Sequence, residues 1–254
     1  MSMYERFSAV YDSLMEEIPY TDWCRYLCGL LRENHIEDGL VLELGCGTGT
    51  MTELLAETGY DMTGIDSSFE MLQQAIEKRD ASGLPILYLN QDMRAFELYG
   101  TMRAVVAVCD TMNYLTEEAD FVTTLRLVNN YLDPGGLFIF DLKTEHCFQD
   151  IMGERTEVTE DDRATVIWEN YYDPETRINE YALTIFEETE NGLYEKSEEF
   201  HEQRAYTVPE IRRMAAEAGM EFVAAYKAFT REAPDEDAER IYMILKEKGK
   251  KETA

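Results

Sequence analysis

Between Gly39 and Leu142 the chain alternates short apolar runs with segments whose apolar residues recur at every third or fourth position. The apolar runs predict strands at 39–44, 61–65, 86–89, 104–109 and 137–142. The helical spacing predicts helices at 50–57, 69–79 and 116–132. Repeated strand–helix–strand units with right-handed crossovers predict a doubly wound sheet, with its ligand site at the carboxyl ends of the strands.

Helical and extended patterns continue on both sides of this region. Two helices are predicted at the start of the chain, over Tyr4–Glu17 and Tyr20–Glu33. Near the other end, a capping-box pattern at Thr207 starts a further helix. Two last strands, Phe222–Phe229 and Arg240–Lys246, complete an expected seven-stranded, mostly parallel sheet.

A different pattern lies between Lys143 and Arg204, where helical spacing gives way to β-character. It predicts three strands, at 165–172, 177–187 and 193–206, joined by turns at Asp173-Pro174 and Asn191-Gly192. We interpret this segment as a three-stranded antiparallel β lid inserted after the fifth strand. The expected division is therefore a core of residues 1–142 and 205–254 and an insert of residues 143–204, which would cover the acceptor region.

The faces of the insert depend on the last of these turns. If Asn191-Gly192 is a two-residue turn, His201 pairs with Ala182. His201 would then lie on the opposite face of the sheet from Tyr181 and Phe200. Only one face can look into a pocket, and the pattern leaves open which one.

Composition narrows the classes of partner. The formal net charge of −29 over 254 residues repels polyphosphates and anionic lipid, so neither nucleic acid nor a membrane is expected as a partner. No run of about 18 apolar residues exists and the opening residues show no apolar signal region, which favours a cytoplasmic protein. Five scattered cysteines fit a reducing compartment and lack the spacing of a metal site, so no metal is expected.

The strongest chemical signal is the glycine-rich segment after the first strand. Gly45, Gly47 and Gly49 alternate with other residues, and a helix is predicted from Thr50. Glycines let the backbone turn and approach a ligand, and the helix start offers unpaired N–H groups. A dinucleotide fingerprint would place glycine at position 50, so NAD(P) binding is disfavoured. The chain also lacks a P-loop pattern, while Glu43 stands two residues before the first glycine.

Acidic residues stand at the ends of the next three strands. Asp66 follows the second strand, about twenty residues after the glycines, where a carboxylate can bind both ribose hydroxyls of a nucleoside. Asp92 follows the third strand, where it can accept from an adenine amino group while Met93 offers its N–H. Asp110 ends the fourth strand. Together with the glycines, these positions indicate an adenosine-type pocket.

The pattern Glu43-x-Gly45-x-Gly47-x-Gly49, followed by these acids, resembles that of the class I S-adenosylmethionine-dependent methyltransferases. Over nearly the whole chain the sequence resembles the YqeM-like members of that class. It is also similar to sugar N,N-dimethyltransferases with a comparable antiparallel insert. The resemblance implies a Rossmann-like methyltransferase fold and S-adenosylmethionine as the cofactor.

The resemblance also implies a set of cofactor-binding residues. An N-terminal segment with Tyr4 and Tyr11 would fold over the cofactor, and Asp110 would lie beside the sulfonium. The residues expected to hold the cofactor are Tyr4, Tyr11, Trp23, Glu43, Gly45, Cys46, Gly47, Asp66, Ser67, Met71, Asp92, Met93, Asp110 and Tyr114.

The expected reaction is methyl transfer by in-line displacement to a nitrogen or oxygen atom of a small molecule. Alignment of the acceptor provides most of the rate, and a general base would help by ~10²–10⁴-fold. The candidates for catalysis are His201, Tyr171 and Arg204. Two alternatives stay open, a non-catalytic cofactor sensor or partner protein and an NAD(P)-linked enzyme, and the protein could be a monomer or a homodimer.

Overall fold

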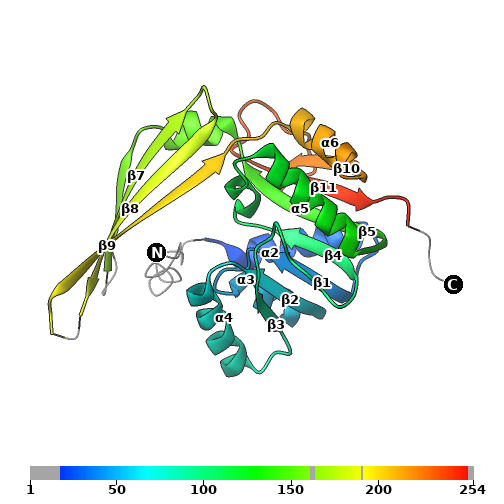
Figure 1. Cartoon of the computed structure of the whole chain (residues 1–254), viewed down its shortest axis with the longest axis horizontal. Helices are drawn as coiled ribbons and strands as arrows, with labels where there is room; N and C mark the ends of the chain where they lie inside the picture. Colours follow the sequence, from blue (N-terminus) through cyan, green and yellow to red (C-terminus); the bar gives the residue numbers. More distant parts are fainter. Residues whose placement is uncertain (1–17, 161–163, 190, 251–254) are drawn as a thin grey trace.

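The computed structural model describes residues 18–160, 164–189 and 191–250, arranged as two β-sheets with helices (Figure 1). The larger sheet has seven strands in the order β10-β11-β5-β4-β1-β2-β3. Strands β1 to β5 run parallel, and β11 pairs antiparallel with both β5 and β10. The strands are β1 (Gly39–Leu44), β2 (Tyr60–Asp66), β3 (Leu87–Asn90), β4 (Met102–Ala107), β5 (Leu132–Lys143), β10 (Met220–Lys227) and β11 (Arg240–Glu247).

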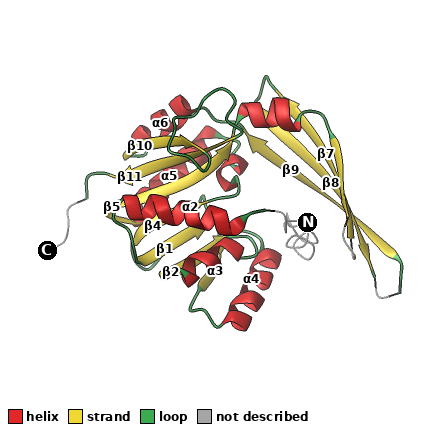
Figure 2. Cartoon of the chain, turned by 180° about the vertical axis from the view of Figure 1, so that it is seen from behind, coloured by secondary structure: helices red, strands yellow, loops and turns green. Residues whose placement is uncertain are grey.

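Helices cover both faces of this sheet (Figure 2). One face packs against α2 (Tyr20–Glu33), α3 (Thr50–Glu57) and α4 (Phe69–Ser82). The other packs against α5 (Glu118–Tyr131) and α6 (Val208–Glu217). The predicted helix at 4–17 lies outside the described residues.

The apolar runs of the sequence explain this layering. In β4, Val105 packs in the core on the α5 side and Val106 in the core on the α3 side, and neither is exposed. A strand buried on both faces needs apolar residues at successive positions, because successive side chains point to opposite faces. The predicted doubly wound, seven-stranded, mostly parallel sheet is confirmed.

The smaller sheet is the insert, and it has one strand more than predicted. It contains β6 (Thr156–Glu160), β7 (Ala164–Asp173), β8 (Ile178–Glu188) and β9 (Tyr194–Arg204), all antiparallel and in that order. A helical turn, η2 (Cys147–Met152), leads into it. All five residues of β6 are exposed, so no buried apolar stripe marks this edge strand in the sequence. Figure 1 shows the sheet projecting away from the core.

The predicted register of the last hairpin is wrong by one residue. Tyr181 pairs with His201, and Ala182 pairs with Phe200. The strands separate after the Glu188–Tyr194 pair, and the Thr189 N–H donates to the Leu193 carbonyl, so the connection is longer than two residues. A shift of one residue exchanges the faces of a strand. His201 therefore shares a face with Tyr181 instead of opposing it.

None of the described helices is long and apolar enough to cross a bilayer.

The capping box of α6 yields a first prediction. The Thr207 hydroxyl accepts from the Glu210 N–H, and the Glu210 carboxylate accepts from the Thr207 N–H. Thr207→Ala removes one of these bonds and is expected to lower the free energy of unfolding by about 1 kcal/mol. Thr123→Ala in the exposed middle of α5 is the control, because that hydroxyl donates only to the Ala119 carbonyl. Urea unfolding measures both variants, and an equal loss of the free energy of unfolding in the two would contradict the prediction.

Candidate active site

The glycine segment forms a tight loop between β1 and α3. Gly45 and Gly47 have φ values of 62° and 53°, a region that favours glycine. A Cβ atom on Gly45 would collide with the side chain of Thr111. A Cβ on Gly47 would meet nothing within 4 Å, because that backbone faces open space. A ligand can therefore approach the main chain at Gly47 directly.

Asp66, at the end of β2, completes this loop. Its Oδ2 accepts from the Gly47 N–H at 2.8 Å, and its Oδ1 accepts from the Ser68 N–H at 2.8 Å. Burial raises the pKa of Asp66, although the backbone N–H donors partly offset this effect. The carboxylate is fixed beside the open glycine backbone and keeps lone pairs that can accept from ligand hydroxyls.

Glu43 and Cys46 lie beneath the loop rather than on the cavity. Glu43 is 2% exposed and accepts from the Thr52 hydroxyl. Burial raises the pKa of Glu43 to about 8. Cys46 is also buried, with its N–H donating to the Ile65 carbonyl. The structure therefore places both residues under the loop, which they support, and neither of them lines the cavity.

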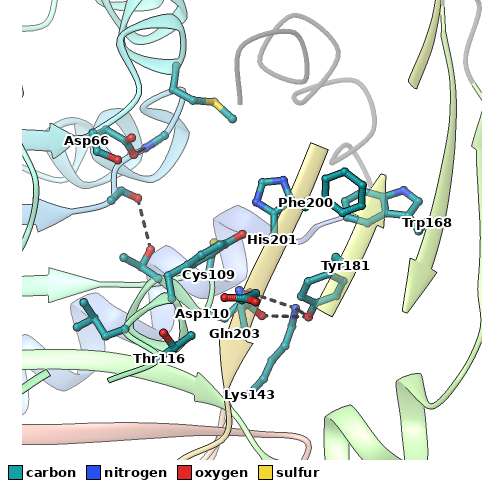
Figure 3. A pocket seen from close by; sticks show the side chains of 18 of the residues that line it. Asp66, Cys109, Asp110, Thr116, Lys143, Trp168, Tyr181, Phe200, His201 and Gln203 are labelled. Carbon is teal, nitrogen blue, oxygen red and sulfur yellow. Dashed lines mark hydrogen bonds and ion pairs between the residues drawn. The ribbon is translucent and has the colours of Figure 1, made fainter. Parts of the chain in front are cut away.

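A cavity of about 860 Å³ extends from the loop to the insert sheet (Figure 3). It is large enough for a nucleoside cofactor and a second small molecule. Tyr4 and Tyr11 lie outside the described residues. The residues expected from the sequence that line the cavity are Trp23, Gly45, Gly47, Asp66, Ser67, Met71, Asp92, Met93, Asp110, Tyr114 and His201.

Asp92, beyond the end of β3, is paired within its own loop. Its Oδ2 lies 2.6 Å from a guanidinium nitrogen of Arg94, and its Oδ1 accepts from the Arg94 N–H at 2.8 Å. These bonds lower the pKa of Asp92. Arg94 also reaches Asp120 at 3.1 Å. The carboxylate stays ionised and accessible on the cavity wall, where it can accept a further hydrogen bond.

Asp110 lies at the centre of a buried ion cluster. Its Oδ2 lies 3.0 Å from Lys143 Nζ and accepts from Gln203 Nε2 at 2.8 Å, while its Oδ1 accepts from Arg240 at 2.8 Å. Burial alone would raise the pKa of Asp110, but the charges of Lys143 and Arg240 hold it well below its usual range. Arg240 also pairs with Asp141, which is fully buried. Asp110 therefore cannot take up a proton near neutral pH.

Lys143, Arg240 and Gln203 were not predicted as site residues. Lys143 ends β5, and Arg240 begins β11, which pairs with it in the register Arg240↔Lys143. Trp23 stacks over Arg240, with the guanidinium carbon 4.9 Å from the ring centre. The sequence offered one signal for this cluster: Lys143 is a cation directly after the predicted strand 137–142.

The inner face of the insert sheet forms the opposite wall of the cavity. It presents Trp168, Asn170, Tyr181, His201 and Gln203. The Tyr181 hydroxyl donates to Gln203 Oε1 at 3.0 Å and lies 3.2 Å from Lys143 Nζ. The insert is thus bonded to the ion cluster of the core (Figure 3).

His201 is part of this inner wall because of the corrected register. Its side chain is 3% exposed, and its ring centre lies 6.0 Å from that of Tyr114. His201 Nε2 is 3.4 Å from Glu199 Oε2 on the same strand. The imidazole therefore lies at the junction of the insert and the carboxyl ends of the core strands.

The other two candidates for catalysis do not line the cavity. Tyr171 is 50% exposed and lies on the outer face of the insert, because its neighbours Asn170 and Tyr172 point inward. Arg204 donates to the Thr116 carbonyl at 2.9 Å and joins the end of β9 to the start of α5. The alternation of side chains along the strands explains both positions.

Comparisons with known proteins agree with this geometry. Residues 41–136 match the family model described as a methyltransferase domain. The YqeM protein of Bacillus subtilis (strain 168) is 33% identical over 244 residues, which cover 94% of this chain and 95% of that protein. Both the core and the insert therefore take part in the likeness.

Two solved structures extend the comparison. The S-adenosylmethionine-dependent methyltransferase of Clostridium acetobutylicum has a TM-score of 0.85 and 25% identity, over 97% of this chain and 99% of that one. The S-adenosylmethionine-bound amino pentose methyltransferase of Micromonospora echinaspora has a TM-score of 0.72 and 17% identity, over 97% of this chain and 99% of that one. The second likeness is one of fold.

The buried Glu43 gives a pH prediction. Its pKa of about 8 lies above the ordinary value of 4.5, so between these values the folded protein keeps a proton that the unfolded chain releases. The free energy of unfolding should then fall as the pH rises from 5 to 8, on the order of 4 kcal/mol from this group. Glu43→Gln keeps the bond from Thr52 and removes this dependence. Urea unfolding at pH 5 and pH 8 measures this dependence, and Glu37→Gln, at an exposed position, is the control. The prediction would be contradicted if the free energy of unfolding changed equally with pH in the wild type and in Glu43→Gln.

Proposed function

This chain belongs to the YqeM family of S-adenosylmethionine-dependent methyltransferases, and we propose that it methylates a nitrogen or oxygen atom of a small molecule. The observation that carries the proposal is one continuous cavity. The Gly47 backbone and Asp66 lie at one end of it, and the ring-lined wall of the insert lies at the other. A cofactor and an acceptor can meet in this one cavity.

We assign the adenosine half of the cofactor to the loops after β1, β2 and β3. The open backbone at Gly47 would lie against the cofactor, with Gly45 beside it on the cavity wall, and Asp66 would accept from the ribose hydroxyls. Asp92 and Met93 would take the adenine edge. Ser67 and Met71, at the start of α4, line the same part of the cavity. Glu43 would act indirectly, by fixing the loop from below.

The reaction depends more on the alignment of the acceptor than on activation of the methyl group. When bound, the cofactor supplies a methyl group on a positively charged sulfur that is already a good electrophile. The chain has to hold the acceptor lone pair in line with that methyl group, and such positioning is worth ~7–11 kcal/mol. The insert, bonded to Asp110 through Gln203, would supply the fixed wall against which the acceptor rests.

We propose the insert, residues 143–204, as the acceptor region and His201 as the proton acceptor. His201 is the candidate for catalysis that lines the cavity, whereas Tyr171 and Arg204 do not. The amino pentose acceptor of the Micromonospora echinaspora enzyme supports a small polar molecule.

Cofactor binding is tested with S-adenosylhomocysteine in calorimetry. Asp66→Ala removes a charged acceptor and frees the Gly47 N–H, and we expect the affinity to fall by about 10–100-fold. Asp61→Ala, at an exposed position on the same strand, is the matched control and should bind normally. Unchanged affinity in Asp66→Ala would refute the assigned site.

Turnover is tested by S-adenosylhomocysteine formation with libraries of amines and alcohols. His201→Asn is expected to reduce kcat by ~10²–10⁴-fold while the cofactor affinity stays the same, because a base acts only on the acceptor. His146→Asn is the control, since His146 pairs with Asp150 away from the cavity lining. Full activity of His201→Asn would exclude His201 as the base. Failure to turn over any acceptor would favour a cofactor sensor.

A further inference from the structure

The acceptor end of the cavity carries a row of aromatic rings. Tyr181 on β8 lies directly opposite His201 on β9, and Trp168 on β7 is the diagonal neighbour of Tyr181 on the same face. Diagonal and direct neighbours across a sheet are close enough for such side chains to form one surface. Tyr114 faces His201 from the core, with ring centres 6.0 Å apart. Figure 3 shows Trp168, Tyr181 and His201 around the same space.

The charges at the base of this space are already balanced. Lys143 and Arg240 are both bonded to Asp110, and Arg240 is also bonded to Asp141. No net positive charge therefore comes from this cluster, although two basic side chains line the cavity there.

The wall itself adds negative charge near the rings. Glu157 on β6 pairs with Trp168 across the sheet and lines the cavity, and Glu199 lies beside His201. Arg155 also lines the cavity, at an exposed position just before β6. The Asn170 N–H donates to the Arg155 carbonyl, so Arg155 is in line with Tyr181 across the sheet, and one guanidinium as well as the Glu157 carboxylate borders the rings.

The reaction moves a positive charge toward this wall. As the acceptor lone pair forms the bond to the methyl carbon, the carbon–sulfur bond breaks and its electron pair stays on sulfur. The positive charge thereby passes from sulfur to the acceptor atom. A neutral amine becomes a substituted ammonium ion, which aromatic faces and carboxylates attract. If the wall stabilises the positive charge more strongly as this charge reaches the acceptor atom, it lowers the barrier of the methyl transfer.

A hydroxyl acceptor would need a base as well as alignment. Its oxygen must lose a proton to a base, and Asp110 is held ionised by three donors with a pKa well below its usual range. Asp110 therefore offers no proton acceptor on the floor of the site, and a hydroxyl acceptor would depend on His201 alone.

We infer that Trp168, Tyr114 and Glu157 form a subsite for a substituted ammonium group and that the acceptor of this enzyme is an amine. Tyr181 supports this subsite from below, because its ring already contacts the Lys143 ammonium, 5.3 Å from the ring centre. The inference rests on the proposed function, because it describes the product state of the same methyl transfer.

The test compares two isosteric probes on protein saturated with S-adenosylhomocysteine. Choline carries a quaternary ammonium group, and 3,3-dimethylbutan-1-ol has the same shape without the charge. Calorimetry should show choline binding at least about tenfold more tightly. Equal binding of the two probes would overturn the inference. Failure of S-adenosylhomocysteine itself to bind would instead refute the proposed function, so the two failures are distinguishable.

Variants locate the subsite. Trp168→Leu should weaken choline binding by about tenfold, Trp168→Phe should restore most of it, and Glu157→Gln should weaken it severalfold. Tyr171→Leu and Glu169→Gln make the same kinds of change on the outer face of β7 and should have no effect. Choline binding that survives both Trp168→Leu and Glu157→Gln would overturn the assignment. In each variant, unchanged affinity for S-adenosylhomocysteine shows that the fold is intact.

Discussion

The buried ion cluster around Asp110 is the interaction on which the site depends. Removing charges from water is costly unless each one is paired and hydrogen-bonded. Asp110, Lys143, Arg240 and Asp141 meet this condition together, since every one of them has a partner of opposite charge. Losing any one of the four would leave an uncompensated buried charge.

The cluster also fixes the relation between the two sheets. It gathers the ends of β4 and β5 and the start of β11, and it reaches the insert through Gln203. The same bonds hold an unusual backbone at the end of β4, where Cys109 and Asp110 have φ values of 58° and 57°. The Asp110 N–H donates to Asp141 at 3.1 Å, which helps to hold that conformation. Such strained residues persist where the surroundings determine them, as at functional sites.

The end of the cavity at Gly47 and Asp66 could be predicted because its signals are local. Gly45, Gly47 and Asp66 occupy a loop and the end of the next parallel strand, and a βαβ unit always brings those positions together. The position of the Glu43 side chain could not be predicted from the motif. Its place in the motif is correct, but its side chain points under the loop and pairs with Thr52.

The end of the cavity at the insert sheet could not be predicted, because it depends on pairing between distant segments. The exposed strand β6 has no buried stripe to reveal it, and the register of β8 with β9 depends on the length of one connection. That single residue decides whether His201 faces the cavity or solvent.

The sequence by itself determined the succession of strands and helices in the core, the glycine loop and the acids beside it, because periodicity and backbone freedom are properties of short segments. Only the tertiary structure decided which side chains meet across the cavity. Arg240 lies 130 residues from Asp110 in the chain, and the two come together because β11 inserts beside β5. Pairing of this kind follows from the packing of the whole sheet and leaves no local mark.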